Sequence, residues 1–165
     1  MDRELHALET LRAAGRVGSA VFAACCAERL RPLLSRVPSG APPLLAGVAL
    51  TELWRVLEGL QRPDPRRLRE LSETLWTMVE IEPVPEVRTE LLEALVAAAH
   101  DALETYLLGN AQHAAAAAKK VAAVAGPAEP GLQDADLADI AGARSDLPAL
   151  ATRLRRRAEG TPKKK

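Results

Sequence analysis

The stretch "VFAACCAERLRPLL", from Val21 to Leu34, decides the fold of this 165-residue chain. Its first half is apolar at almost every position, and on a helical wheel Phe22, Cys26 and Leu30 share one face. A helix that is apolar nearly all round is typical of a buried helix. We therefore predict that this stretch forms a central helix of a helical bundle.

Three residues near the end of this stretch, Glu28, Arg29 and Pro32, interrupt the apolar pattern. Inside a helix, Pro32 would lack the amide that bonds to the carbonyl of Glu28, so we expect the helix to bend or to recruit another donor there, which gives a polar niche. A buried charge needs a partner, and Glu28 could pair with Arg31 or with an arginine of another helix. The niche is either a structural ion-pair knot or a binding site for a ligand or partner.

The two cysteines of the chain, Cys25 and Cys26, are adjacent. On a helix their side chains point about 100° apart and cannot form a disulfide with each other. They also lack the spacing of a pair of zinc ligands, and no second pair exists in the sequence. We predict that both pack as small apolar groups and that the protein has neither a metal nor a cofactor.

The remaining sequence also favours helices. Apolar residues make up 48% of the chain but aromatic residues only 2%, and a mixture dominated by Ala and Leu favours helix formation. The 3.6-residue period predicts a first helix that ends near Ala14 and a second helix that includes the opening stretch. Further helices are predicted over about 43–60, 65–79, 86–108, 111–125 and 146–157. Residues 132–143 are expected to form a short or fraying helix at best. The fold class is therefore all-α, a compact bundle of about six to seven helices that includes antiparallel helical hairpins.

We expect residues 1–158 to form a single helical domain. In it, residues 1–125 form the core, residues 126–143 a connection that contains Pro and Gly, and residues 144–158 a C-terminal helix. The last residues, 159–165, are expected to be a basic flexible tail. The beginning of the chain has no signal-peptide pattern and no apolar run reaches membrane-spanning length, so we expect a cytoplasmic protein with no membrane contact.

The formal net charge is zero, but the last 13 residues carry +6. Arg153, Arg155, Arg156 and Arg157 supply most of this charge and are candidates for an electrostatic contact. Such a segment could touch nucleic acid, acidic lipid head groups or the acidic remainder of the chain, or it could be a solvated helix end. Because aromatic residues that could stack on bases are scarce, the nucleic-acid hypothesis ranks second.

Three segments, taken in order, resemble a known family. "AERLRP", "LTELWRVLEG" and "LLEALVAAAHDALETYLLGNAQHAAAAAKKVAAVAG" are similar to successive helices of the bacterial proteins called domain of unknown function family 416. The resemblance covers about residues 5–125. It implies an all-helical fold and no established activity, and it makes Glu28, Arg29 and Pro32 the first residues to mutate.

The sequence names no catalytic residue. His6, His100 and His113 fall in three different predicted helices, and His100 alone has a suggestive neighbour, Glu104, one turn later. The leading hypothesis is therefore a non-enzymatic protein that binds another protein or itself. The alternative is a nucleic-acid-associated protein that uses the basic C-terminal segment. A third hypothesis is an enzyme or ligand binder around Glu28, His100 and Glu104, provided that the fold brings them together.

Overall fold

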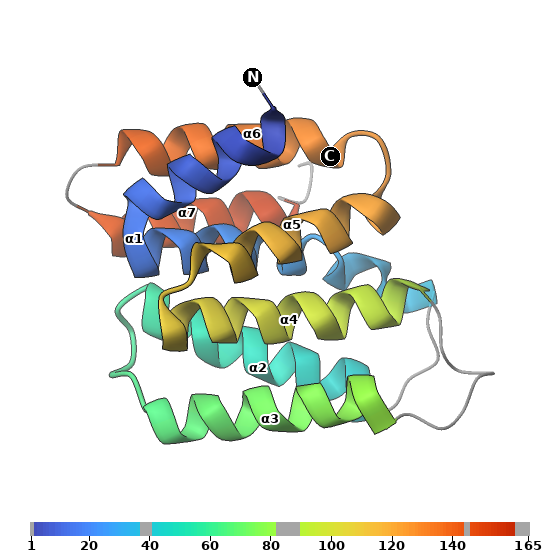
Figure 1. Cartoon of the computed structure of the whole chain (residues 1–165). Helices are drawn as coiled ribbons and strands as arrows, with labels where there is room; N and C mark the ends of the chain where they lie inside the picture. Colours follow the sequence, from blue (N-terminus) through green and yellow to red (C-terminus); the bar gives the residue numbers. More distant parts are fainter. Residues whose placement is uncertain (1, 37–40, 82–89, 144–145, 161–165) are drawn as a thin grey trace, which may run out of the picture.

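The computed structural model describes residues 2–36, 41–81, 90–143 and 146–160 of the chain. Within these residues there are seven α-helices, one 3-10 helix and no strand (Figure 1). In chain order these are α1 (Arg3–Glu28), the 3-10 helix η1 (Arg31–Arg36), α2 (Ala41–Leu57), α3 (Pro65–Ile81), α4 (Glu90–Leu108), α5 (Ala111–Ala125), α6 (Glu129–Gly142) and α7 (Leu147–Glu159). The predicted all-α bundle is confirmed.

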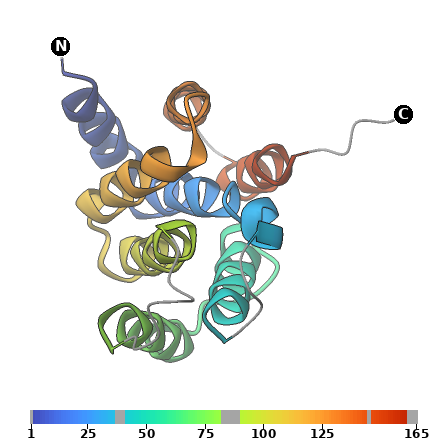
Figure 2. The ribbon, with the colours of Figure 1, turned by 90° about the vertical axis from the view of Figure 1, so that its right-hand side faces the viewer.

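Helix α1 is the central element, as its apolar sequence predicts. It contacts α2, α4, α5, α6 and α7, and every residue from Gly18 to Glu28 is buried. Figure 1 shows α6 and α7 above the second half of α1, α5 in front of it and α2, α3 and α4 below it, and Figure 2 shows the same arrangement from the side. Both cysteines of α1 are fully buried and free, as expected for small apolar side chains.

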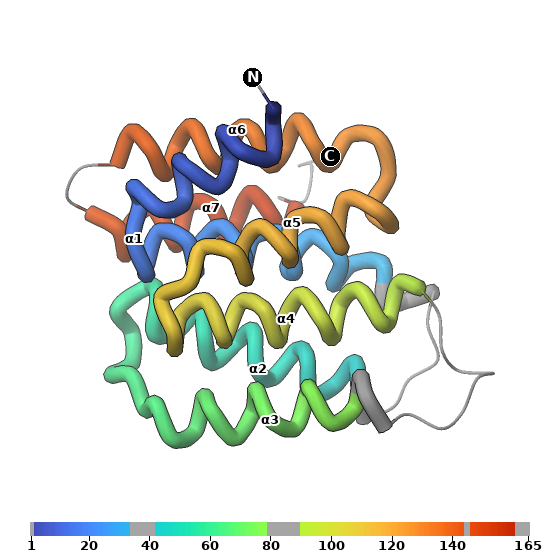
Figure 3. The backbone as a smooth tube through the Cα atoms, in the orientation of Figure 1, coloured from blue at the N-terminus to red at the C-terminus, as the bar shows by residue number. Residues whose placement is uncertain are grey.

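Helix α1 changes direction at Gly15. This glycine has φ 79° and ψ −172°, a conformation that only glycine adopts readily, so the two halves of the helix point in different directions (Figure 3). The kink agrees with the predicted end of a first helix near Ala14. The first half of α1 packs on α5 and α6, while the second half crosses the core.

Two turns set the antiparallel neighbours of the second half of the chain. Gly109 ends α4 with φ 70°, and Asn110 caps α5 by accepting a hydrogen bond from the Gln112 amide (2.9 Å), which gives the predicted helical hairpin. Asp146 caps α7 in the same way through the Ala149 amide (3.1 Å). The predicted start of a helix at Glu86 and the predicted basic tail after residue 160 lie outside the described residues.

The expectation of a bent helix at Pro32 is wrong. The α-helix ends at Glu28, and Pro32 lies in η1, where the Leu33 amide donates to the Leu30 carbonyl (3.0 Å). Glu28 is the residue whose carbonyl the missing proline amide would have bonded in a continuous helix. The chain ends the helix at this residue instead of bending it.

The expectation of a short or fraying helix in residues 132–143 is also wrong. Helix α6 has 14 residues and packs on α1. Its buried face combines the polar residues Glu129, Gln133 and Asp136 with Leu137 and Ile140. A helical period carried largely by polar side chains is invisible to a search for apolar periodicity, which explains the error.

Candidate functional site

Glu28 is a buried carboxylate with two partners. Its Oε1 and Oε2 accept hydrogen bonds from Nη1 of Arg31 (3.0 and 3.3 Å), and Oε2 also accepts one from Nε1 of Trp54 (3.1 Å). Burial raises the pKa of Glu28, although Arg31 and Trp54 act to lower it. Of the two partners that the sequence left open for Glu28, the observed one is Arg31.

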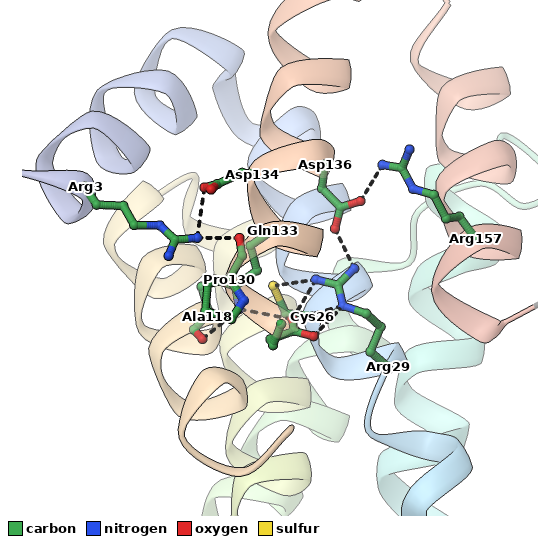
Figure 4. Close-up of polar contacts among 10 residues, drawn as sticks. Arg3, Cys26, Arg29, Ala118, Pro130, Gln133, Asp134, Asp136 and Arg157 are labelled. Atoms are coloured by element: carbon green, nitrogen blue, oxygen red, sulfur yellow. Dashed lines mark hydrogen bonds and ion pairs between the residues drawn. The ribbon is translucent and has the colours of Figure 1, made fainter. Parts of the chain in front are cut away.

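Arg29 points away from this pair and toward α6. Its Nε donates to both carboxylate oxygens of Glu129 (2.9 Å each), and Nη2 donates to Oε1 of the same residue (2.7 Å). Nη1 donates to Oδ2 of Asp136 (2.6 Å; Figure 4). The side chains of Arg29, Glu129 and Asp136 are 10%, 2% and 1% exposed, so this is a buried ion-pair cluster.

Further residues extend the cluster to α5 and α7. Oδ1 of Asp136 accepts from Nη2 of Arg157 (2.7 Å), and Nε2 of Gln133 donates to Glu129 (3.1 Å) and to the Ala118 carbonyl (3.0 Å). We call Arg29, Glu129, Gln133, Asp136 and Arg157 the Arg29 network. It joins four helices in one set of hydrogen bonds (Figure 4).

The Arg29 network is structural in character. Its two guanidinium groups balance its two carboxylates, and burial, which by itself would lower the pKa of Arg29, is outweighed by the bonds to Glu129 and Asp136. Among the described residues no buried side-chain nitrogen or oxygen lacks a hydrogen-bond partner. A cluster whose charges are all paired offers a charged ligand no free group, so we assign it to the ordering of the fold.

The predicted niche of Glu28, Arg29 and Pro32 is therefore divided in space. Glu28 bonds to a residue of α2, Arg29 bonds to residues of α6, and the side chain of Pro32 is exposed in η1. The sequence identified the two buried charges, but not that their partners lie on different helices. It could not predict that Arg29 binds residues about one hundred positions further along the chain.

A second polar cluster surrounds His100 on α4. Its ring lies against Trp76 of α3, with 5.2 Å between ring centroids and 36° between planes. Nε2 of His100 lies 3.6 Å from Oε1 of Glu104, and Ser72 donates a hydrogen bond to the same oxygen. We call Ser72, Trp76, His100 and Glu104 the Trp76 surface, because the indole, 48% exposed, is its most accessible part.

Asp101 connects the Trp76 surface to α5. Its Oδ2 accepts from Nζ of Lys120 (2.7 Å), and its Oδ1 lies 3.5 Å from Nδ1 of His113. Burial acts to raise the pKa of Asp101, but His100 and Lys120 outweigh it, and the pKa is lowered. In the described residues no three His, Cys, Asp or Glu side chains are placed to hold a metal ion.

The structure does not gather the three residues of the third hypothesis. His100 and Glu104 lie together, but the hydrogen bonds of Glu28 go to Arg31 and Trp54. Nor does Ser72 form a nucleophile and base pair with His100, because its hydroxyl donates to the carboxylate of Glu104. Helix pairing, which brings Trp76 and Ser72 to this histidine, is not visible in the sequence.

The four C-terminal arginines have different surroundings. Arg155 pairs with Glu58, the residue after α2, and with Glu159 (2.9 Å), while Arg157 pairs with Asp136 and Asp139 (2.7 Å each). These contacts hold α7 against α2 and α6. Arg153 and Arg156 are exposed, and they remain the candidates on this helix for the predicted electrostatic contact.

An open cavity between the first half of α1, α5 and α6 was missed by sequence reasoning. Its volume is about 430 Å³, and Phe22 of α1 forms part of its wall. Ala115, Ala118 and Ala122 of α5 line it at a spacing of three and four residues. That alanine face was the available signal, because a helix without bulky side chains on one face leaves space beside it.

Comparison with known proteins gives no relative: no protein-family model, no curated protein and no solved structure matches this chain. The resemblance to domain of unknown function family 416 therefore stays a prediction. Among the described residues no helix has the length and apolar character needed to cross a membrane.

Proposed function

We propose that this chain is a non-enzymatic protein that acts by binding another protein, and that the Trp76 surface is its contact site. The observation that carries the proposal is the half-exposed indole of Trp76, which lies against His100 at the junction of α3 and α4. Tryptophan is strongly enriched among the residues that dominate protein interfaces, whereas leucine is under-represented. For this reason we favour Trp76 over Leu44 and Leu60, which are more exposed.

The surroundings of Trp76 support a rigid anchor. His100 is held between the carboxylates of Glu104 and Asp101, and Ser72 in turn binds Glu104. An aromatic side chain that rests on an ordered neighbour loses little conformational freedom on binding. A partner with an apolar pocket for the indole would therefore gain most of the contact energy at this residue.

The state of the polar groups supports binding over catalysis. The buried charges that the sequence singled out, Glu28 and Arg29, are used in ion pairs within the fold. The hydroxyl of Ser72 donates to the carboxylate of Glu104 and not to His100, so these residues do not form a serine–histidine pair. These contacts support a stable scaffold that presents a surface.

A photo-crosslinking experiment tests this proposal. The variant Thr77→p-benzoylphenylalanine carries a crosslinker on the exposed residue next to Trp76, and the cross-linked partner from the native source is identified and purified. Trp76→Ala should then weaken the purified complex by about 2–4 kcal/mol. The matched control is Leu132→Ala, an exposed apolar residue on α6, which should leave the affinity unchanged.

Two results would contradict the proposal. One is an equal affinity of the partner for Trp76→Ala and for the unchanged protein. The other is the absence of any specific adduct at Thr77. Sedimentation of the purified chain alone shows whether the partner is a second copy, since self-association would then depend on Trp76.

A further inference from the structure

We propose that the cavity between α1, α5 and α6 is a binding site for a small uncharged amphiphile, and that the first half of α1 is its lid. We call this space the α1–α5–α6 cavity. Its volume of about 430 Å³ lies within the range of about 300–1,000 Å³ that is usual for small-molecule sites. This site is separate from the Trp76 surface, which is formed by α3 and α4.

The walls of the cavity are predominantly apolar. They include Leu8, Phe22, Ala115, Ala118, Ala122 and Leu137. The alanines of α5 leave this space unfilled, and Leu8 and Phe22 of α1 and Leu137 of α6 border it from the other sides. An apolar chain that enters this space would leave water and replace missing contacts with these walls.

One buried polar group in the wall indicates where the polar end of a ligand would bind. Gln133 lines the cavity and is 8% exposed. Its Nε2 donates to the Ala118 carbonyl and to Glu129, which fixes the orientation of the amide. Its Oε1 accepts no hydrogen bond from any of the described residues. Since no buried side-chain oxygen of the described residues lacks a partner, water reaches this oxygen, and a ligand with a hydroxyl or amide N–H group would replace that water as the donor.

The charges at the mouth favour a ligand without net charge. Arg3, Glu4, Lys119 and Asp134 line the cavity and are exposed, so the two positive charges face two negative ones. Arg3 is already paired with Asp134 (2.9 Å). Because neither sign is in excess, an anionic or cationic head group gains little there over its hydration in water.

The first half of α1 is attached more weakly than the second half. Among its described residues before Gly15, Leu11 alone is buried, and Leu5 is 48% exposed. At its beginning, Arg3 reaches across to the Pro130 carbonyl and to Asp134 of α6 (Figure 4). Its other flank borders a second hollow, of about 430 Å³, against the end of α6.

Gly15 has the properties of a hinge for this segment. Its φ of 79° favours glycine, and a Cβ added there would meet no atom within 4 Å. A side chain at this position would therefore disturb the backbone angle without a steric clash. The hinge at Gly15 and the Arg3 contacts define a segment that can swing out and open the cavity.

Calorimetric titration of the purified full chain with octanol tests the site, with octanoate and octylammonium as charged probes. We expect saturable binding of octanol and at least about tenfold weaker binding of both ions. Ala115→Leu fills the cavity and should remove binding, whereas Ala123→Leu, an exposed residue of the same helix, should preserve it. No octanol binding, or equal binding by Ala115→Leu, would overturn the site.

Hydrogen exchange tests the lid without relying on the ligand. Gly15→Ala should speed amide exchange in residues 3–14 by about five- to thirtyfold, and Gly142→Ala, which also has an open Cβ position, should not. Arg3→Ala should also speed amide exchange in residues 3–14, without affecting the hinge. In the unchanged protein, octanol should slow this exchange. Unchanged exchange in both Gly15→Ala and Arg3→Ala would overturn the lid.

Discussion

Arg29 and Asp136 lie 107 residues apart in the sequence, yet their side chains form a hydrogen bond of 2.6 Å inside the protein. The bond joins the end of α1 to the middle of α6, beside the contacts of Arg29 with Glu129. Apart from Leu137 and Ile140, the buried residues of α6 are polar. Helix α6 is therefore attached to the core mainly by matched charges.

The first prediction concerns the stability that depends on this match. Arg29→Met keeps most of the side-chain volume but leaves Glu129 and Asp136 without their shared cation. We expect the free energy of unfolding to fall by about 3–5 kcal/mol, the usual cost of breaking a buried ion pair. Denaturant unfolding followed by circular dichroism measures the change.

Arg3→Met is the control for this experiment. Its ion pair with Asp134 is more than half exposed on both sides, so its loss should cost less than about 1 kcal/mol. A loss of equal size in the two variants would contradict the assignment of the Arg29 network as the tie between α1 and α6.

The second prediction is a pH dependence from Glu28. Burial raises its pKa above the ordinary value of 4.5, so the folded state holds this proton more tightly than the unfolded chain does. The contribution of Glu28 to stability is then complete below pH 4.5 and is lost as the pH rises through the folded pKa. Compared with Glu28→Gln, the unchanged protein should lose stability as the pH rises above about 4.5.

Asp101 provides a comparison of opposite sign. Its pKa lies below the ordinary value of 3.8, so its contribution is present above that value and is lost as the pH falls through the folded pKa. The advantage of the unchanged protein over Asp101→Asn should shrink on acidification. The same slope for both residues would show that one of the two assignments is wrong.

The third prediction concerns the reactivity of Cys25 and Cys26. Burial raises the pKa of both thiols, and neither side chain is accessible. A disulfide reagent such as dithionitrobenzoate should therefore modify neither cysteine in the native protein and both after unfolding. If either thiol is modified at a rate that does not depend on denaturant, α1 opens locally in the native protein. That result would contradict the prediction.

The fourth prediction concerns the contact between α1 and α6 at Gly18. A Cβ at this position would lie 2.8 Å from Cβ of Ala14 and 3.3 Å from Cγ2 of Ile140. Gly18→Ala should therefore destabilise the protein by about 1–3 kcal/mol through overpacking. The control is Gly142→Ala, whose added Cβ meets nothing within 4 Å, so that it shows the general effect of an alanine in a helix. Thermal unfolding compares the two variants. Equal melting temperatures of Gly18→Ala and Gly142→Ala would contradict the prediction.

The helices were predictable where an apolar period marks them. Local sequence predicts three features of the fold: the apolar "VFAACCAE" run of α1, the apolar stripe of α3, and the hairpin at Gly109 and Asn110. Helix α6 was not predictable in this way, because Glu129, Gln133 and Asp136 occupy its buried face. Their burial becomes favourable only beside Arg29, and that contact depends on the complete fold.

The candidate sites were predictable to different extents. Glu28 and its partner Arg31 are close in sequence, so helical spacing reveals the pair. Trp76 and His100 belong to different helices, and no local rule places one ring against the other. The α1–α5–α6 cavity depends on how closely three helices approach, which the side-chain volumes of any one helix do not determine.

The central position of α1 has a consequence for biosynthesis. Its buried segment, Gly18 to Glu28, leaves the ribosome well before Glu129 and Asp136, which bind Arg29 and follow about 100 residues later. At about 5–20 residues per second this delay is about 5–20 seconds. During this time Arg29 has no ion-pair partner, although α2, α4 and α5, which also contact α1, emerge before α6.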